Sequence, residues 1–219
     1  LIDSGFDDII DDYVLTSSID TVTTLASYSN VSTRGRGIIS LIGIEDFDEL
    51  KVLAFPINEI NTINISRNLK LENVSFRWNQ LSTIDISQNT ALKIFDAAGN
   101  PFTVNTIDIS NNINLEYFNI GGNSTSGVSG SGPSDYSGTT TVISSGITFN
   151  IPAQKSEITS IDFSNNPKLR GIGIVDSKVS VSDFSGYTNL SSIEGLSLKG
   201  NNISSIDLSN FTNLNRLFL

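Results

Sequence analysis

The sequence predicts a repeat solenoid dominated by short parallel β-strands, an α/β-type array in which each unit packs on its neighbours. One three-residue phrase, a polar residue between two apolar ones, recurs along the 219 residues. Its polar positions are Asn64, Asp85, Asp108, Asp162, Asp183 and Asp207, the fifth copy being degenerate. The intervals between these positions are 21, 23, 54, 21 and 24 residues, and a repeat of this length is typical of stacked coils.

A second phrase of the form Leu-x-x-Leu-x-Leu-x-x-Asn precedes the copies of the first. Its copies begin at Leu50, Leu71, Leu92 and Leu115, weaker ones follow around Leu169 and Leu196, and the last begins at Leu214. The Leu-x-Leu core predicts a short strand whose alternate side chains point inward, leaving the x position on a concave face. The Asn that follows is expected to bond the turning backbone of the next coil, so that stacked coils form an Asn ladder.

The Ile-Asp-Ile phrase predicts the opposite, irregular wall of each coil, with its apolar residues inward and its Asp in solvent. Ser-x-Asn-x-x-Leu then closes the coil with turn-forming residues. One coil buries apolar side chains worth roughly 9–18 kcal/mol, whereas ordering its backbone costs roughly 20–40 kcal/mol, so single coils need neighbours. A compact β-sandwich is the alternative fold, but a sandwich does not require the same phrases at regular intervals.

The predicted organisation has two parts and one interruption. Residues 1–49 are expected to form an N-terminal cap and a degenerate first repeat with a strand at Val22–Leu25, and 50–219 about seven coils, the last incomplete. From Asn123 to Ile161 the chain runs 38 residues, against five from Asn79 to Ile84, which predicts an insertion at 124–157. Its first half is rich in Gly and Ser, and its second half reads as a β-hairpin. A functional loop and a neutral insertion both remain open.

Composition excludes several classes of function. The net charge of −10, from 13 Lys and Arg against 23 Asp and Glu, argues against nucleic acid and anionic membranes. Because His and Cys are absent, the commonest general base, the thiolate nucleophile and the usual zinc ligands are missing. We therefore expect no enzyme, no cofactor and no metal. The sequence has no apolar run of 18 residues and no initiator Met, and we expect an internal piece of a longer precursor.

The candidate binding residues lie on or beside the predicted concave face. They are Arg77, Trp78, Asp96, Tyr117 and Asn119, and the insertion adds Asp135 and Tyr136. An exposed Trp beside Arg77 and near Tyr117 is typical of a sugar-stacking or protein hot-spot arrangement, with packing over the coil edge as the alternative. Gly171 and Gly173 flatten the face, either to admit a ligand or to tolerate the neighbouring insertion.

The Asp row of the opposite wall and the acidic group at residues 7–12 are weaker candidates for cations. Calcium needs six to eight oxygens that converge on one point, and a single row does not converge. Glycosidase chemistry needs two carboxylates that face each other across a cleft, which an open wall does not provide. Solvation of these carboxylates is therefore the favoured interpretation.

The repeats resemble those of the leucine-rich-repeat surface and secreted proteins of Bacteroidetes, which are related to internalin-like arrays of Gram-positive bacteria. The unit 79–92 carries the likeness most clearly, with cap-like segments at 1–8 and 12–16 and a first repeat at 43–50. The resemblance implies a leucine-rich-repeat horseshoe exported to the medium or to the outer surface of a Gram-negative cell, often by type IX secretion. It also makes Thr21, within Asp20-Thr21-Val22, a candidate O-glycosylation site.

Two non-catalytic functions follow from these expectations. The first is an adhesion or binding module that recognises a protein or a glycan. The alternative is a structural accessory subunit or spacer docked in an outer-membrane or extracellular protein complex.

Overall fold

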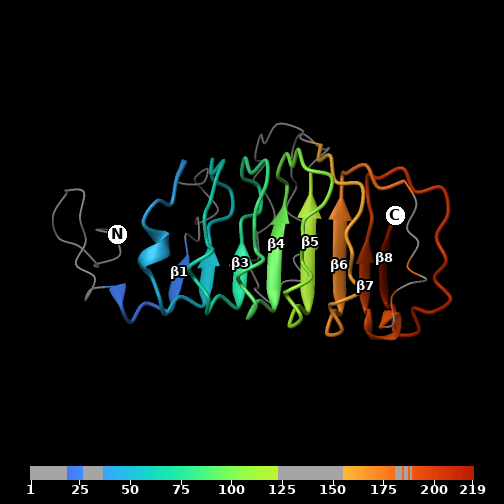
Figure 1. Ribbon diagram of the computed structural model, residues 1–219. Helices are drawn as coiled ribbons and strands as arrows, with labels where there is room; N and C mark the ends of the chain where they lie inside the picture. The colour runs from blue at the N-terminus through green and yellow to red at the C-terminus, as the bar shows by residue number, and fades with distance from the viewer. Residues whose placement is uncertain (1–18, 27–36, 123–154, 181–183, 185–186, 188) are drawn as a thin grey trace, which may run out of the picture.

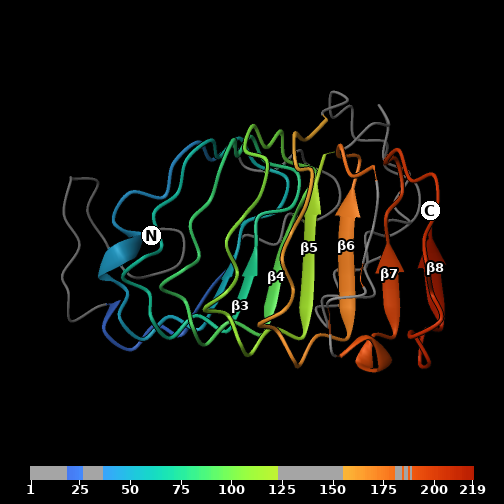
Figure 2. The ribbon, with the colours of Figure 1, turned by 45° about the vertical axis from the view of Figure 1, so that its right-hand side comes forward.

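The computed structural model describes residues 19–26, 37–122, 155–180, 184, 187 and 189–219. Within them, eight strands form one parallel sheet in chain order: β1 (Thr24–Ala26), β2 (Val52–Ala54), β3 (Asn73–Ser75), β4 (Ile94–Ala98), β5 (Tyr117–Gly121), β6 (Gly171–Val175), β7 (Gly195–Ser197) and β8 (Arg216–Phe218). Figures 1 and 2 show the strands side by side as one wall of a stack of coils. The same described residues also form two 3-10 turns, η2 (Ile44–Asp46) and η3 (Leu190–Ser192). The predicted solenoid of short parallel strands is confirmed.

Strand register follows the alternation that the leucine phrase predicts. From β2 to β7, the second residue of each strand points into the core: Leu53, Val74, Phe95, Phe118, Ile172 and Leu196 are all at most 2 % exposed. Their neighbours along each strand lie on the other face of the sheet. Phe95 stacks on Phe118 with ring centroids 5.6 Å apart, so neighbouring coils share one continuous core.

The predicted Asn ladder is present at Asn58, Asn79, Asn100 and Asn201. Asn100, for example, is fully buried, and its Nδ2 donates to the carbonyls of Phe76 (2.9 Å) and Ala97 (2.8 Å). Its Oδ1 accepts from the amide of Leu81 at 2.9 Å. Phe76 and Leu81 belong to the preceding coil, so the ladder Asn reaches back along the chain and not forward as expected.

A second Asn ladder, on the other side of each coil, was not foreseen. Its members are the Asn residues of the Ser-x-Asn-x-x-Leu turn, Asn68, Asn89, Asn112 and Asn166, all at most 2 % exposed. The Nδ2 of Asn89 donates to the carbonyls of Ile65 (2.8 Å) and Asn68 (3.0 Å), and Asn112 repeats the pattern on Ile86 and Asn89. The turn phrase thus supplies stacking bonds between coils as well as a change of direction.

The Ile-Asp-Ile wall also follows the prediction. Ile84 and Ile86 are buried while Asp85 between them is exposed, and Asp108, Asp162 and Asp207 are exposed in the same way. Each of these carboxylates accepts a bond from the backbone amide two residues later, at 2.9 Å. The wall is therefore a series of side-chain-stabilised turns without regular secondary structure.

At the N-terminal end, β1 at Thr24–Ala26 confirms the degenerate strand expected around Val22–Leu25. The cap expected before Ile19 and the greater part of the 124–157 insertion, including Asp135 and Tyr136, lie outside the described residues. On the far side of the insertion the amide of Glu157 donates to the carbonyl of Phe102 at 2.7 Å. At the other end, Leu217, Phe218 and Leu219 are 39, 46 and 60 % exposed.

Candidate functional site

The sheet presents two rows of side chains on the face opposite the core. We call them the first row (Val52, Asn73, Ile94, Tyr117, Gly171 and Gly195) and the second row (Ala54, Ser75, Asp96, Asn119, Gly173 and Ser197), because they are the first and third residues of β2 to β7. From Val52 to Tyr117 the first row is half-buried. The second row is buried apart from Ser75. The first row is therefore the more accessible part of this concave face.

Three of the predicted site residues form one buried polar network centred on Asp96. The carboxylate of Asp96 is paired with Arg77 (Nη1 to Oδ2, 3.2 Å), and Oδ1 accepts from Asn119 Nδ2 at 3.1 Å. The Ala98 amide also donates to Oδ1, at 3.3 Å. Asp96 is 3 % exposed and Asn119 is 5 % exposed. The network joins three successive coils across the sheet.

The electrostatics of Asp96 reflect two opposing effects. Burial raises the pKa of its carboxyl, while Arg77 and the bonds from Ala98 and Asn119 lower it; the balance lies above the usual value. A buried ion pair contributes little net stability, but removing one partner leaves an uncompensated charge. Asp96 therefore holds Arg77 and Asn119 in place, and both of its carboxylate oxygens are bonded to groups of the protein itself.

Trp78 is packed and not exposed, so the expectation of a solvent-facing indole is wrong. The residue is 9 % exposed and adopts a left-handed backbone with φ of 53°. Its ring lies where a side chain at residue 99 would be, since a Cβ built on Gly99 would approach Trp78 Cδ1 to 2.1 Å. Arg77 covers the ring, with Cζ 4.7 Å from the centroid. The alternative of packing over the coil edge is the one that the structure supports.

Tyr117 lies apart from this cluster. It is the first residue of β5, half-buried in the first row between Ile94 and Gly171, whereas Trp78 follows the end of β3. The expected proximity of Trp78 and Tyr117 is therefore wrong. The order of the strands could be read from the sequence. The side chain of Trp78 lies beyond the end of β3 and that of Tyr117 at the start of β5, and the direction of the Trp78 side chain depends on the turn after β3.

Gly173 has a structural explanation. An ideal Cβ at this residue would lie 2.2 Å from Asn119 Oδ1, so the side chain of Asn119 covers the glycine. Asn119 lies in the last coil before the insertion and Gly173 in the first coil after it. The missing side chain thus accommodates the end of the polar network.

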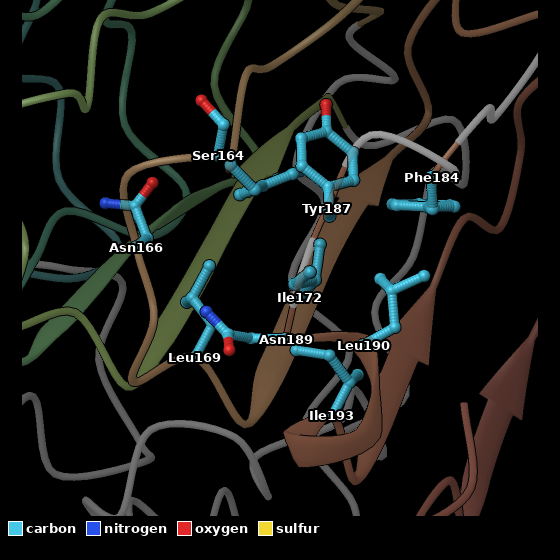
Figure 3. Close-up of a pocket in the computed structure, with 10 residues that line it drawn as sticks. Ser164, Asn166, Leu169, Ile172, Phe184, Tyr187, Asn189, Leu190 and Ile193 are labelled. Atoms are coloured by element: carbon cyan, nitrogen blue, oxygen red, sulfur yellow. The ribbon is translucent and has the colours of Figure 1, made fainter. Parts of the chain in front are cut away.

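A small cavity in the core marks where the second Asn ladder ends (Figure 3). Its volume is about 20 Å³, enough for one water molecule, and its apolar lining includes Leu169, Ile172 and Leu190. Tyr187 occupies the position equivalent to Asn166 and donates its hydroxyl to the carbonyl of Ile161 at 3.1 Å. Tyr187 thus stands in place of a ladder Asn beside this cavity, which is too small for an organic ligand.

The described members of the Asp row, Asp85, Asp108, Asp162 and Asp207, serve the turns of the wall. Within the described residues, no group of three or more Asp or Glu side chains is placed to hold a metal ion. For Asp85, Asp108 and Asp162 the backbone bond from the following Ser lowers the pKa of the carboxyl. Their oxygens serve the turns of their own coils. Thr21 is exposed just before β1, so glycosylation there stays a prediction.

The part of the chain that the structure describes contains no helix long and apolar enough to cross a membrane. No known protein-family model matches the sequence, and no curated protein matches it.

Solved structures do match. Internalin C2 of Listeria monocytogenes is 18 % identical with a TM-score of 0.50, over 94 % of this chain and 83 % of the other. The plant peptide hormone receptor RGFR1, in complex with RGF2, is 20 % identical with a TM-score of 0.50, over 83 % of this chain and 30 % of the receptor. The functional domain of InlJ from Listeria monocytogenes is 16 % identical with a TM-score of 0.42, and this chain spans half of it. Together with the parallel sheet and the two Asn ladders, the likenesses to internalin C2 and to the plant receptor show that the chain folds as a leucine-rich-repeat solenoid.

Proposed function

We propose that the chain is a non-catalytic binding module that holds a protein partner on its concave face. The observation that carries the proposal is the first row, where Val52, Asn73, Ile94 and Tyr117 stand half-buried on neighbouring strands. Apolar and aromatic side chains around an amide are the composition of a protein-binding surface core. The peptide hormone receptor, which has the same fold, was solved in complex with RGF2.

Charge on this face supports the same proposal. The chain has a net charge of −10, yet Asp96 is the single charged residue within strands β2 to β7, and it is paired with Arg77. Acidic side chains are thus kept off the face whose centre would be desolvated by a partner. Charged residues are depleted in the cores of protein interfaces for this reason.

The buried network gives the first row a rigid support. Because Asp96 and Asn119 bond within the sheet, they contribute to binding by fixing the face and not by contacting a partner directly. The side chain of Arg77 is 16 % exposed, against 4 % for Asp96, so Arg77 is the member of this ion pair that a partner can reach. We place the functional contacts at the first row and Arg77, with Trp78, Asp96 and Asn119 beneath them.

We further propose that the protein acts outside the cell or on the outer surface of a Gram-negative cell, with a glycan as the alternative to a protein ligand. The 124–157 insertion, with Asp135 and Tyr136, is a second proposed contact region. Docking as an accessory subunit in an outer-membrane complex is the rival, and it predicts stable co-purification with membrane proteins.

The test is quantitative binding with purified ligand, found by pull-down from surface extracts and by a glycan array. Tyr117→Ala is expected to raise Kd about tenfold or more, as expected for a central aromatic contact. Ile113→Ala is the matched control, because Ile113 is 53 % exposed on a turn of the same coil. Equal effects of the two changes, or none from Tyr117→Ala and Ile94→Ala, would contradict the concave site. Deletion of residues 124–154 measures the insertion's contribution separately.

A further inference from the structure

The residue immediately before each strand from β2 to β7 is charged, and its sign alternates along the solenoid. From β2 to β7 these residues are Lys51, Glu72, Lys93, Glu116, Arg170 and Glu194. We call them the charge ladder. Its neighbours at both ends, Thr23 before β1 and Asn215 before β8, are neutral.

Backbone bonds keep successive members of the charge ladder next to each other. The amide of each member donates to the carbonyl of the preceding one, as from Glu72 to Lys51, Lys93 to Glu72 and Glu116 to Lys93, at 2.8 Å in each case. The amide of Arg170 donates to Glu116 at 2.8 Å, and that of Glu194 to Arg170 at 2.7 Å. Neighbouring charges are therefore held at the spacing of adjacent strands.

The side chains interact as the alternation requires. Lys93 pairs with Glu72 (Nζ to Oε2, 2.5 Å), and Arg170 places both Nε (2.9 Å) and Nη2 (2.6 Å) on Glu194 Oε1. The pKa of Glu72 is lowered first by Lys93 and also by Lys51. Attraction from Glu194 and Tyr117, and then from Glu116, raises the pKa of Arg170. Each inner member thus feels an opposite charge on both sides.

Exposed ion pairs of this kind contribute little net stability. The charges have a stronger effect on incorrect stacks, in which a coil pairs with a coil other than its neighbour in sequence. Because the coils share one apolar pattern, a coil that stacked on the next but one would still bury its leucines. In such a stack Lys51 would meet Lys93, and Glu72 would meet Glu116, and like charges on neighbouring strands repel.

We propose that the charge ladder sets the order in which the coils stack, by penalising every stack that omits one coil. The widest gap in the charge ladder lies between Glu116 and Arg170, which are 54 residues apart, whereas other successive members are 21 to 24 residues apart. Correct pairing of coils is hardest to achieve across this gap. Arg170, before β6, attracts Glu116, whereas Glu194, before β7 in the following coil, would repel it. The charge ladder thereby directs the chain to the correct coil after the insertion.

Two variants of equal net charge test the proposal. Lys93→Glu/Glu116→Lys keeps the composition but creates two like-charged contacts, with Glu72 and with Arg170. The six-residue inversion, Lys51→Glu/Glu72→Lys/Lys93→Glu/Glu116→Lys/Arg170→Glu/Glu194→Lys, keeps the alternation. The first is expected to lower the folding equilibrium constant about 5- to 25-fold and to slow refolding, and the inversion to behave like the parent. Both are measured by urea unfolding and refolding at low salt.

Salt and a local probe separate this mechanism from loss of side-chain packing. In 1 M NaCl, where charges are screened beyond about 3 Å, the double variant should recover toward the parent. In Arg170→Glu the amides of Arg170 and Gly171, which donate to Glu116, should exchange hydrogen about fivefold faster. Lys178→Glu, which breaks the cross-coil pair with Glu157 outside the charge ladder, is the control and should leave them unchanged. Equal losses in the double variant and the inversion, or no effect of salt, would overturn the proposal.

Discussion

The indole of Trp78 occupies the space that a side chain at residue 99 would need. A Cβ on Gly99 would lie 2.1 Å from Cδ1 and 2.8 Å from Nε1 of the indole. The two residues are equivalent positions in successive coils, each directly before a ladder Asn and each with positive φ, 53° at Trp78 and 82° at Gly99. The position of the Trp78 indole thus depends on glycine at residue 99 in the following coil.

Gly99→Ala is therefore expected to lower the free energy of unfolding by about 2–4 kcal/mol, through left-handed strain and overpacking together. Urea unfolding measures the loss. Gly43→Ala is the control, since φ there is 91° but no described atom lies within 4 Å of the added Cβ, so strain acts alone. Trp78→Ala in the Gly99→Ala background should relieve the overpacking. Equal losses for the two glycine changes would contradict the packing contact.

Gly173→Ala should disturb the polar network from its other end. The new methyl group would meet Asn119 Oδ1 at 2.2 Å and displace the amide from Asp96. We expect a loss of roughly 1–3 kcal/mol. Asn119→Ala removes the obstructing atoms, so the double variant should lose less than the sum of the single changes. Additive losses in the double-mutant cycle would show that Gly173 and Asn119 act independently.

Arg77→Ala should be more harmful than loss of a surface charge. It leaves Asp96, 3 % exposed, without its cation, and breaking a buried pair typically costs about 3–5 kcal/mol. Asp96→Asn in the same chain removes the uncompensated charge and should recover part of the loss in urea unfolding. Lys70→Ala, which breaks an exposed pair with Glu49, should cost less than about 1 kcal/mol. No recovery in the double variant would argue against the buried charge as the cause.

Asp108 should make stability depend on pH in the acid range. The amide of Ser110 lowers the pKa of the Asp108 carboxyl in the folded chain. In the acid range the folded state therefore binds fewer protons than the unfolded state. The contribution of Asp108 is therefore present above the carboxyl's ordinary pKa and is lost as pH falls through the lowered folded value. Asp108→Asn should flatten this part of the stability–pH curve while keeping the turn.

The natural precedent for that variant is Asn64, whose Oδ1 accepts from the Ser66 amide at 3.1 Å in the same kind of turn. Asp108→Ala should lose both the turn bond and the pH dependence. Chemical denaturation between pH 2 and pH 7 distinguishes the variants. If Asp108→Asn loses as much stability on acidification as the parent does, the bond to Ser110 does not cause that loss.

The candidate site was only partly readable from sequence. The alternation of the leucine phrase correctly placed Ile94, Asp96, Tyr117 and Asn119 on the concave face. It could not tell that Asp96 and Asn119 bond each other, because that contact depends on two coils 23 residues apart. The second Asn ladder was missed because turn-forming Asn residues are usually explained by local bonds, whereas Asn89 donates to the coil before it.

The sequence by itself determined the architecture of this protein. A short period of apolar residues cannot bury its core within one coil, so the coils of such a chain must stack, and alternation then fixes which residues face inward. Tertiary structure alone decided the burial of each concave residue. Trp78 became packing because the next coil has Gly99, and Asp96 became a buried anchor because Arg77 and Asn119 flank it from coils on either side. Those contacts join different repeats, and no single repeat specifies them.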